Sequence, residues 1–209
     1  MNIMQNKPRG YCERLLVIDV ETSGYARNSD DMSYSSATGD TYQMISCGLI
    51  VVNAQTLKTI EELYVEIKWD GSSVWDMGAQ AVHGLTLQYL EEHGMTTTEA
   101  VMEIAGLILK YWGPTSPVVL VGHNVATFDT WFLKRLLRSE KIEVKFSNRM
   151  IDTNTVGFVV FSTFNSDDVF EQVGCGIRDG SKHNALDDAR MSLQVVRTAR
   201  MISDTVLGE

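Results

Sequence analysis

Cysteine is scarce in this sequence, and long hydrophobic runs are missing. The 209 residues include three cysteines, which are scattered and form no C-x-x-C pair: Cys12, Cys47 and Cys175. This usage is typical of a reducing compartment and argues against structural zinc. No apolar run approaches the roughly 20 residues that a membrane span requires, and residues 1–9 lack the apolar core of a signal peptide. We therefore expect a cytoplasmic protein with no membrane partner.

Basic side chains are also in the minority. The chain has 18 Lys and Arg against 27 Asp and Glu, which gives a net charge of −9. The excess of acids lies in residues 1–133, whereas residues 134–209 hold equal numbers of both signs. An acidic protein is poorly suited to gripping long duplexes through their phosphates. The charge is compatible with a metal site that handles only the end of a chain.

The remaining composition is that of one globular domain. Hydrophobic residues make up 44% and charged residues 22%, which is ordinary for a chain that can bury a substantial core. There is no internal repeat and no low-complexity tract, so we expect a single domain over residues 1–209. The polar segment 25–43 is rich in Ser, Asp, Asn and Gly and predicts a long loop insertion. That insertion is either disordered or a flap that faces the substrate.

Hydrophobic patterning predicts strands first and then strands that alternate with helices. Strands are expected in the stretch 15–24, in 44–52, 59–68 and 118–121, and at 150–151; helices are expected over 75–82, 96–112, 128–137, 167–173 and 184–203. The first three strands form a meander, with a hairpin turn at residues 53–55. This order predicts an α/β fold with a mixed sheet covered by helices on both faces.

The first strand ends in two carboxylates, Asp19 and Glu21. Residues two apart in a strand point to the same side, so both carboxylates face one spot. Two like charges beside a hydrophobic strand repel each other and are poorly solvated, and a bound divalent cation relieves both problems. An isolated Asp-x-Glu is more often a strand end with solvated acids, so other carboxylates must join it to support a metal site.

Asp129 is a third candidate acid. It follows a buried strand and precedes Phe132 and Leu133 by three and four residues, so it faces the core side of the predicted helix. A single inward acid at a helix start is often a capping residue. Here it follows a strand end, which is where ligand sites form in α/β sheets.

The last helix offers two adjacent acids that helical geometry separates. Asp188 shares a face with small and apolar residues such as Ala185 and Val195, whereas Asp187 shares a more polar face. We therefore expect Asp188 to point inward and Asp187 outward. His183 stands at the end of the glycine-rich loop 174–182, which we expect to be mobile without substrate. A lone histidine is more often structural than catalytic.

Together these residues resemble the DEDDh (DnaQ-like) 3′→5′ exonuclease family of the ribonuclease H-like superfamily. The three matching motifs are Ile18-Asp19-Val20-Glu21-Thr22, His123-Asn124 with Phe128-Asp129, and His183-x-Ala185-x-x-Asp188-Ala189. Residues 81–85 resemble the loop with which that family meets the terminal nucleotide, and Asp152 matches a further recurring acid. The sequence departs from the family pattern in the 25–43 insertion and in a gap between Asn124 and Phe128 that is one residue longer.

The resemblance implies a ribonuclease H-like fold, with a mixed five-stranded sheet flanked by helices. It implies that four carboxylates hold two divalent cations, Mg²⁺ or Mn²⁺, and that His183 is the general base. The four carboxylates are Asp19, Glu21, Asp129 and Asp188. It also implies a set of substrate-binding residues: Thr22, Ser23, Gly24, His83, Leu85, Asn124 and Phe128.

The activity implied is hydrolysis at the 3′ ends of single-stranded DNA or RNA, with DNA weakly favoured. The alternative is a non-catalytic exonuclease-like module that binds nucleic acid or tethers a partner. The complete set of catalytic positions favours the enzyme. Proofreading subunits, repair exonucleases and RNA-trimming enzymes similar to ribonuclease T share these motifs, so a polymerase or replication partner is one expectation and the oligomeric state is open.

A group of basic residues follows the second motif. It has two interpretations that the sequence leaves equal: a patch that contacts the nucleic-acid strand, or a solvated helix face. The group consists of Lys134, Arg135, Arg138, Lys141, Lys145 and Arg149.

Overall fold

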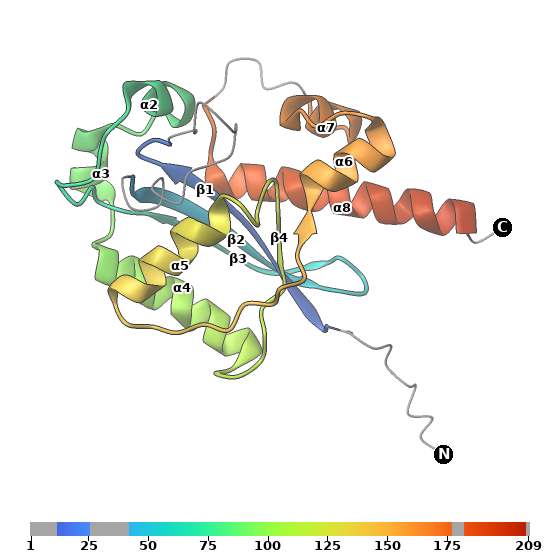
Figure 1. The fold of residues 1–209 in the computed structure, drawn as a ribbon, viewed down its shortest axis with the longest axis horizontal. Helices are drawn as coiled ribbons and strands as arrows, with labels where there is room; N and C mark the ends of the chain where they lie inside the picture. The colour runs from blue at the N-terminus through green and yellow to red at the C-terminus, as the bar shows by residue number, and fades with distance from the viewer. Residues whose placement is uncertain (1–11, 26–41, 177–181, 208–209) are drawn as a thin grey trace.

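Five strands form one mixed sheet in the order β3-β2-β1-β4-β5. The computed structural model describes residues 12–25, 42–176 and 182–207 (Figure 1). The strands are β1 (Arg14–Thr22), β2 (Met44–Asn53), β3 (Thr59–Glu66), β4 (Leu120–Gly122) and β5 (Ile151–Asp152). β2 runs antiparallel to both β1 and β3, whereas β1, β4 and β5 are parallel to one another. The predicted mixed five-stranded sheet is therefore confirmed.

Helices cover both faces of the sheet (Figure 1). The helices of the described residues are α2 (Met77–His83), α3 (Leu87–His93), α4 (Thr97–Trp112), α5 (Asp129–Ser139), α6 (Thr153–Phe161), α7 (Ser166–Gln172) and α8 (Ala185–Leu207). α4 and α5 lie on one face, and α8 crosses the other, where α6 and α7 pack against it. No helix in the described ranges is both long and apolar enough to cross a membrane.

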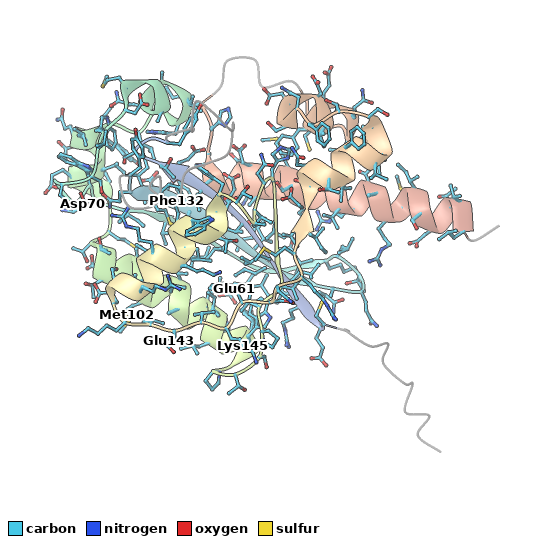
Figure 2. All side chains as sticks on the ribbon, viewed as in Figure 1. Glu61, Asp70, Met102, Phe132, Glu143 and Lys145 are labelled. Atoms are coloured by element: carbon cyan, nitrogen blue, oxygen red, sulfur yellow. The ribbon has the colours of Figure 1, made fainter. Side chains whose placement is uncertain are left out.

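The alternation of β1 assigns its residues to the two faces. Leu16 and Ile18 belong to the larger core, which includes residues of α4 and α5 such as Phe132, labelled in Figure 2. Leu15 and Val17 point the other way, into the smaller core formed with α8. Because successive side chains in a strand alternate, Asp19 and Glu21 continue the row of Leu15 and Val17. The two acids are thereby directed to the α8 side of the sheet.

α8 approaches the sheet closely at Gly48. This residue pairs with Asp19 in the β1–β2 ladder. A Cβ at Gly48 would lie 2.4 Å from the carbonyl oxygen of Ala185 and 2.4 Å from the backbone of Leu186. Only a residue without a side chain lets the first turn of α8 lie this close to β2. The beginning of α8 is therefore brought beside the end of β1.

Two helices were not predicted, α3 and α6. α3 begins after Thr86, whose side chain accepts from the Tyr89 amide. α6 has the sequence TNTVGFVVF, a largely apolar run without helical periodicity, and begins after Asp152, whose side chain accepts from the Asn154 amide. Both helices have fewer than 10 residues. Such short segments are easily taken for a loop or a strand when only periodicity is used.

Two predicted loops lie largely outside the described residues. Residues 26–41 of the predicted insertion are not described, nor are residues 177–181 of the loop before His183. The expectations of a flap and of a mobile loop therefore stay predictions.

Candidate active site

Asp188 and Asp187 face opposite surroundings in the first turn of α8. Asp188 is 4% exposed, whereas the Asp187 carboxylate is in solvent and accepts from Arg190 Nη1 at 2.7 Å. Asn184 precedes the helix, and its side-chain oxygen accepts from the amides of Leu186 and Asp187. This cap fixes where the helix starts and hence the phase of both acids. The predicted inward and outward directions are confirmed.

His183 is joined to Asp188 and to the end of α2. Its Nδ1 lies 3.2 Å from Asp188 Oδ2. Its backbone amide donates to the Val82 carbonyl at 3.1 Å, and the neighbouring Lys182 Nζ reaches the Gly84 carbonyl at 3.4 Å. The end of α2 therefore anchors the segment that carries the histidine, and Asp188 orients its ring.

Asp129 is the most deeply buried of the predicted acids, with 2% of its surface exposed. It is the first residue of α5. Burial raises the pKa of its carboxyl well above the ordinary range, and the charges of Asp152 and Glu21 act in the same direction. Hydrogen bonds from its own backbone and from that of Val20 partly oppose the rise in pKa. A carboxylate in these surroundings gains from a nearby cation.

Asp152 holds the second motif in place. Its Oδ1 accepts from the amides of Asn124 and Asn154, both at 3.0 Å. Asn124 has φ of 56° and accepts at its carbonyl from the amides of Thr127 and Phe128. The extra residue in this loop is thus accommodated in a turn, and Asp152 ties the loop after β4 to the start of α6.

These elements enclose an open cleft of about 400 Å³ at the carboxyl end of β1. Its lining includes predicted residues from all three motifs: Asp19, Glu21, Asn124, Phe128, His183 and Asp188. Asp129 is not among the lining residues. Its charge interacts with that of Glu21, which does line the cleft. Segments more than 50 residues apart in the chain therefore converge on one site.

A comparison of the sequence with protein-family models identifies the family to which the chain belongs. A family model described as an exonuclease (RNase_T) matches residues 16–196. The chain belongs to this exonuclease family. The predicted family and its ribonuclease H-like fold are therefore confirmed. A search among curated proteins gave no significant sequence match.

Solved exonuclease structures share the fold at low sequence identity. The nuclease domain of 3′hExo bound to rAMP is 15% identical, with a TM-score of 0.66 over 93% of this chain and 94% of that chain. A 3′-exonuclease solved with a histone mRNA stem-loop is also 15% identical, with a TM-score of 0.66 over 93% and 65% of the two chains. E. coli exonuclease I with a dT13 oligonucleotide is 14% identical, with a TM-score of 0.69 over 94% of this chain and 43% of that chain. This exonuclease domain thus spans less than half of the exonuclease I chain.

The donor atoms of the exonuclease site fit a divalent cation. Glu21, His183 and Asp188 each offer a ligand atom, and these atoms all lie within 4.8 Å of one another. Asp19 lines the same cleft. Carboxylate oxygens are the ligands that hard divalent cations prefer. The family and the donor set together imply divalent metal cofactors.

Thr22 and Ser23, two of the predicted substrate contacts, are buried and bonded within the fold. Thr22 Oγ1 donates to the Gly24 carbonyl at 2.9 Å. Ser23 Oγ donates to the Val74 carbonyl at 2.7 Å and accepts from the Gln43 amide. These bonds join the end of β1 to neighbouring segments. Substrate contacts by Thr22, Ser23 and Gly24 stay predictions.

His83 and Leu85, two further predicted contacts, form one unit at the end of α2. His83 is buried, its Nδ1 accepts from the Leu85 amide at 3.0 Å, and its ring packs edge-on against Trp75. Burial lowers the pKa of His83 to about 4, and the charges of Lys182 and His183 act in the same direction. A neutral, buried imidazole suits a structural role, and a direct substrate contact by either residue stays a prediction.

The basic residues predicted as a strand-contacting patch are not all beside the cleft. The amide of Val118, which precedes β4, donates to the Lys145 carbonyl, and Lys145 lies at the opposite end of the sheet from α2 and α7 (Figure 2). Arg135 donates to the Tyr42 carbonyl at 2.5 Å. Lys145 therefore does not belong to a strand-binding patch beside the cleft, and both interpretations of the other basic residues stay open.

Some lining residues were missed by the sequence analysis. They come from the α6–α7 turn and α7: Phe164, Asn165, Ser166 and Phe170. One signal could have revealed them: phenylalanine recurs at every third residue, at Phe158, Phe161 and Phe164. A simple connecting loop does not require so many aromatic residues.

Proposed function

We propose that this protein is a 3′→5′ exonuclease that hydrolyses phosphodiester bonds at single-stranded 3′ ends. The observation that carries the proposal is the cleft in which residues of all three motifs meet, with buried Asp129 in electrostatic contact with it. A module that only bound nucleic acid would not need this complete set of acids and histidine.

In this proposal Asp19, Glu21, Asp129 and Asp188 hold two divalent cations, Mg²⁺ or Mn²⁺. When bound, such ions lower the pKa of a coordinated water and stabilise the charge on the leaving 3′-oxygen. The four carboxylates supply the negative charge that retains the ions. Their partial burial limits competition from solvent, which strengthens electrostatic interactions at the site.

His183 is the general base in this proposal. Its Nδ1 faces Asp188 Oδ2 at 3.2 Å, which favours the tautomer with the proton on Nδ1 and makes Nε2 the basic atom. Nε2 would then accept a proton from the attacking water. Asp188 would serve two purposes: it orients the base and it contributes to the metal site.

Single-stranded nucleic acid is the proposed substrate, with DNA favoured and RNA the alternative. Exonuclease I is described with a dT13 oligonucleotide and 3′hExo with rAMP, so similar structures accept both kinds of ligand. A polymerase or replication partner and a cytoplasmic location stay predictions.

The test is a degradation assay on matched DNA and RNA oligonucleotides labelled at the 5′ end. With Mg²⁺ or Mn²⁺ we expect a ladder that shortens from the 3′ end and releases nucleoside monophosphates, and chelation of the metal should stop it. The Asp19→Asn variant, prepared in the same way, controls for a contaminating nuclease. Binding of the oligonucleotides without shortening would support the non-catalytic module instead.

A further inference from the structure

Two exposed phenylalanines form a flat aromatic surface between α6 and α7. Phe158 is 50% exposed and Phe164 is 57% exposed. Their rings are stacked, with centroids 4.5 Å apart and planes 6° from parallel. Large apolar side chains in a folded protein are usually buried, and a group of exposed ones indicates a binding site.

The turn that carries Phe164 is tied by hydrogen bonds to both flanking helices. Its carbonyl accepts from the Asn154 side chain in α6 at 3.2 Å. The next residue, Asn165, caps α7 by accepting from the Asp168 amide at 3.1 Å. Ser162, at the end of α6, has φ of 60°, which turns the chain sharply. The exposed ring is therefore presented by an ordered turn, which reduces the entropy cost of binding a ligand there.

Phe164 is part of the cleft that holds the acids. It lines the cleft together with Asp19, Glu21 and Asp188. The Asn154 amide that holds the Phe164 carbonyl also lies 3.5 Å from His123 Nε2, in the second motif. The aromatic surface is thus connected to the predicted active site by a shared side chain.

A nucleobase is the ligand that fits this surface. Proteins bind single strands by stacking bases on aromatic side chains, and each stacked base contributes about 1–3 kcal/mol. The chain has a net charge of −9, so attraction to phosphates gives little affinity. Stacking on a neutral base avoids the repulsion between phosphates and an acidic protein.

We propose that Phe164, supported by Phe158, stacks on a nucleobase of the strand next to the scissile phosphate. The inference rests on the proposed exonuclease function and adds the side chain that holds the base. Every base presents an aromatic face, so the contact tolerates any base sequence.

The test compares Phe164→Ala and Phe164→Leu with the wild type on two oligonucleotides. One has a base at every position, and the other is abasic at the penultimate 3′ nucleotide. The wild type should prefer the complete strand by about 5- to 150-fold in kcat/KM, which is the stacking free energy expressed as a ratio. Phe164→Ala should raise KM for the complete strand and remove the preference. Phe164→Leu keeps an apolar side chain without an aromatic face and should also remove most of it.

Val159→Ala is the matched control, because Val159 is 75% exposed on α6, next to Phe158, and does not line the cleft. It should retain the wild-type preference, and Phe164→Trp should restore it. The proposal is overturned if Phe164→Ala discriminates between the two strands as the wild type does, or if Val159→Ala loses the preference equally. If the wild type degrades neither strand, the proposed function fails. The same comparison by fluorescence anisotropy of the labelled strands then decides whether Phe164 stacks.

Discussion

At the scale of single residues, Asp187 and Asp188 differ in what their carboxylates contact. Asp188 is buried beside His183, whereas Asp187 pairs with Arg190 in solvent. An exposed ion pair contributes at most about 1 kcal/mol to stability. The buried carboxylate is placed where it would orient the base and bind metal.

We expect Asp188→Asn to reduce kcat severely, and Asp187→Asn to leave most of the activity, because only the first replaces a carboxylate of the cleft. Steady-state hydrolysis of a 5′-labelled oligonucleotide at saturating Mg²⁺ measures both. Circular dichroism should show that each variant is folded. An equal loss of activity in the two variants would contradict the assignment.

His83 predicts a pH dependence of stability. Its folded-state pKa of about 4 is lower than the ordinary value of 6.5, so the unfolded chain takes up a proton at higher pH than the folded chain does. The stability that His83 contributes is therefore present above pH 6.5 and is lost as the pH falls toward 4. We expect the free energy of unfolding to fall by roughly 1–3 kcal/mol over this range from this residue alone.

The measurement is urea unfolding of the wild type and of His83→Asn at several pH values between 4 and 7.5. Asparagine can still accept from the Leu85 amide but does not titrate, so its curve should be flatter. His93→Asn changes an exposed histidine and should follow the wild-type curve. Parallel curves for the wild type and His83→Asn would rule out this contribution.

At the scale of elements, the close approach of α8 to β2 sets the geometry of the site. Gly48 lies beside Asp19 on the sheet and under the first turn of α8. That turn also carries Asp188, and His183 lies two residues before it. A displacement of the helix start would therefore move two of the proposed catalytic groups away from Asp19 and Glu21.

We expect Gly48→Ala to lower the free energy of unfolding by about 1–3 kcal/mol, the usual cost of overpacking. We also expect kcat to fall by more than the fraction of unfolded protein accounts for. The added Cβ would lie 2.4 Å from backbone atoms of Ala185 and Leu186, so the helix itself must shift. Thermal unfolding and kcat, measured well below Tm, separate the two effects. Gly106→Ala in α4 is the control, because its Cβ meets nothing within 4 Å, and it should be neutral or stabilising by up to about 1 kcal/mol. Wild-type Tm and kcat in Gly48→Ala would refute the argument.

At the scale of the whole molecule, the net charge of −9 limits how the protein holds its substrate. Each phosphate contacted in a single strand contributes about −0.7 to the slope of log affinity against log salt. An acidic protein that grips only the chain end should contact few phosphates.

We therefore expect a shallow salt dependence, with a slope between about −1.4 and −2.1, corresponding to two or three phosphates. The affinity should change little when the oligonucleotide is shortened from about 20 to about 6 nucleotides, a length within the site sizes of single-strand binders. Anisotropy titrations with Asp19→Asn, which should bind without cutting, measure both quantities. A steep slope that increases with strand length would indicate a long basic track instead.

The sequence alone determined those features that depend on neighbouring residues. The alternation in β1 places Asp19 and Glu21 on one side, and the phase of α8 separates Asp187 from Asp188, because strand and helix periods are properties of the local backbone. The order of the elements and the spacing of the three motifs predicted the fold and the family. α3 and α6 escaped prediction because they are short and α6 has no helical periodicity.

Only the tertiary structure decided what depends on packing between distant segments. Thr22 and Ser23 lie at the end of the first motif and His83 in the 81–85 loop, yet their side chains are buried and bonded to the backbone. Phe164 belongs to a segment with phenylalanine at every third residue, but nothing local shows that it lines the cleft; it does so because α6 and α7 pack against α8. Periodicity predicts which face of an element a residue occupies. The partner of that face is set by how the elements pack, which is a long-range property that no local pattern contains.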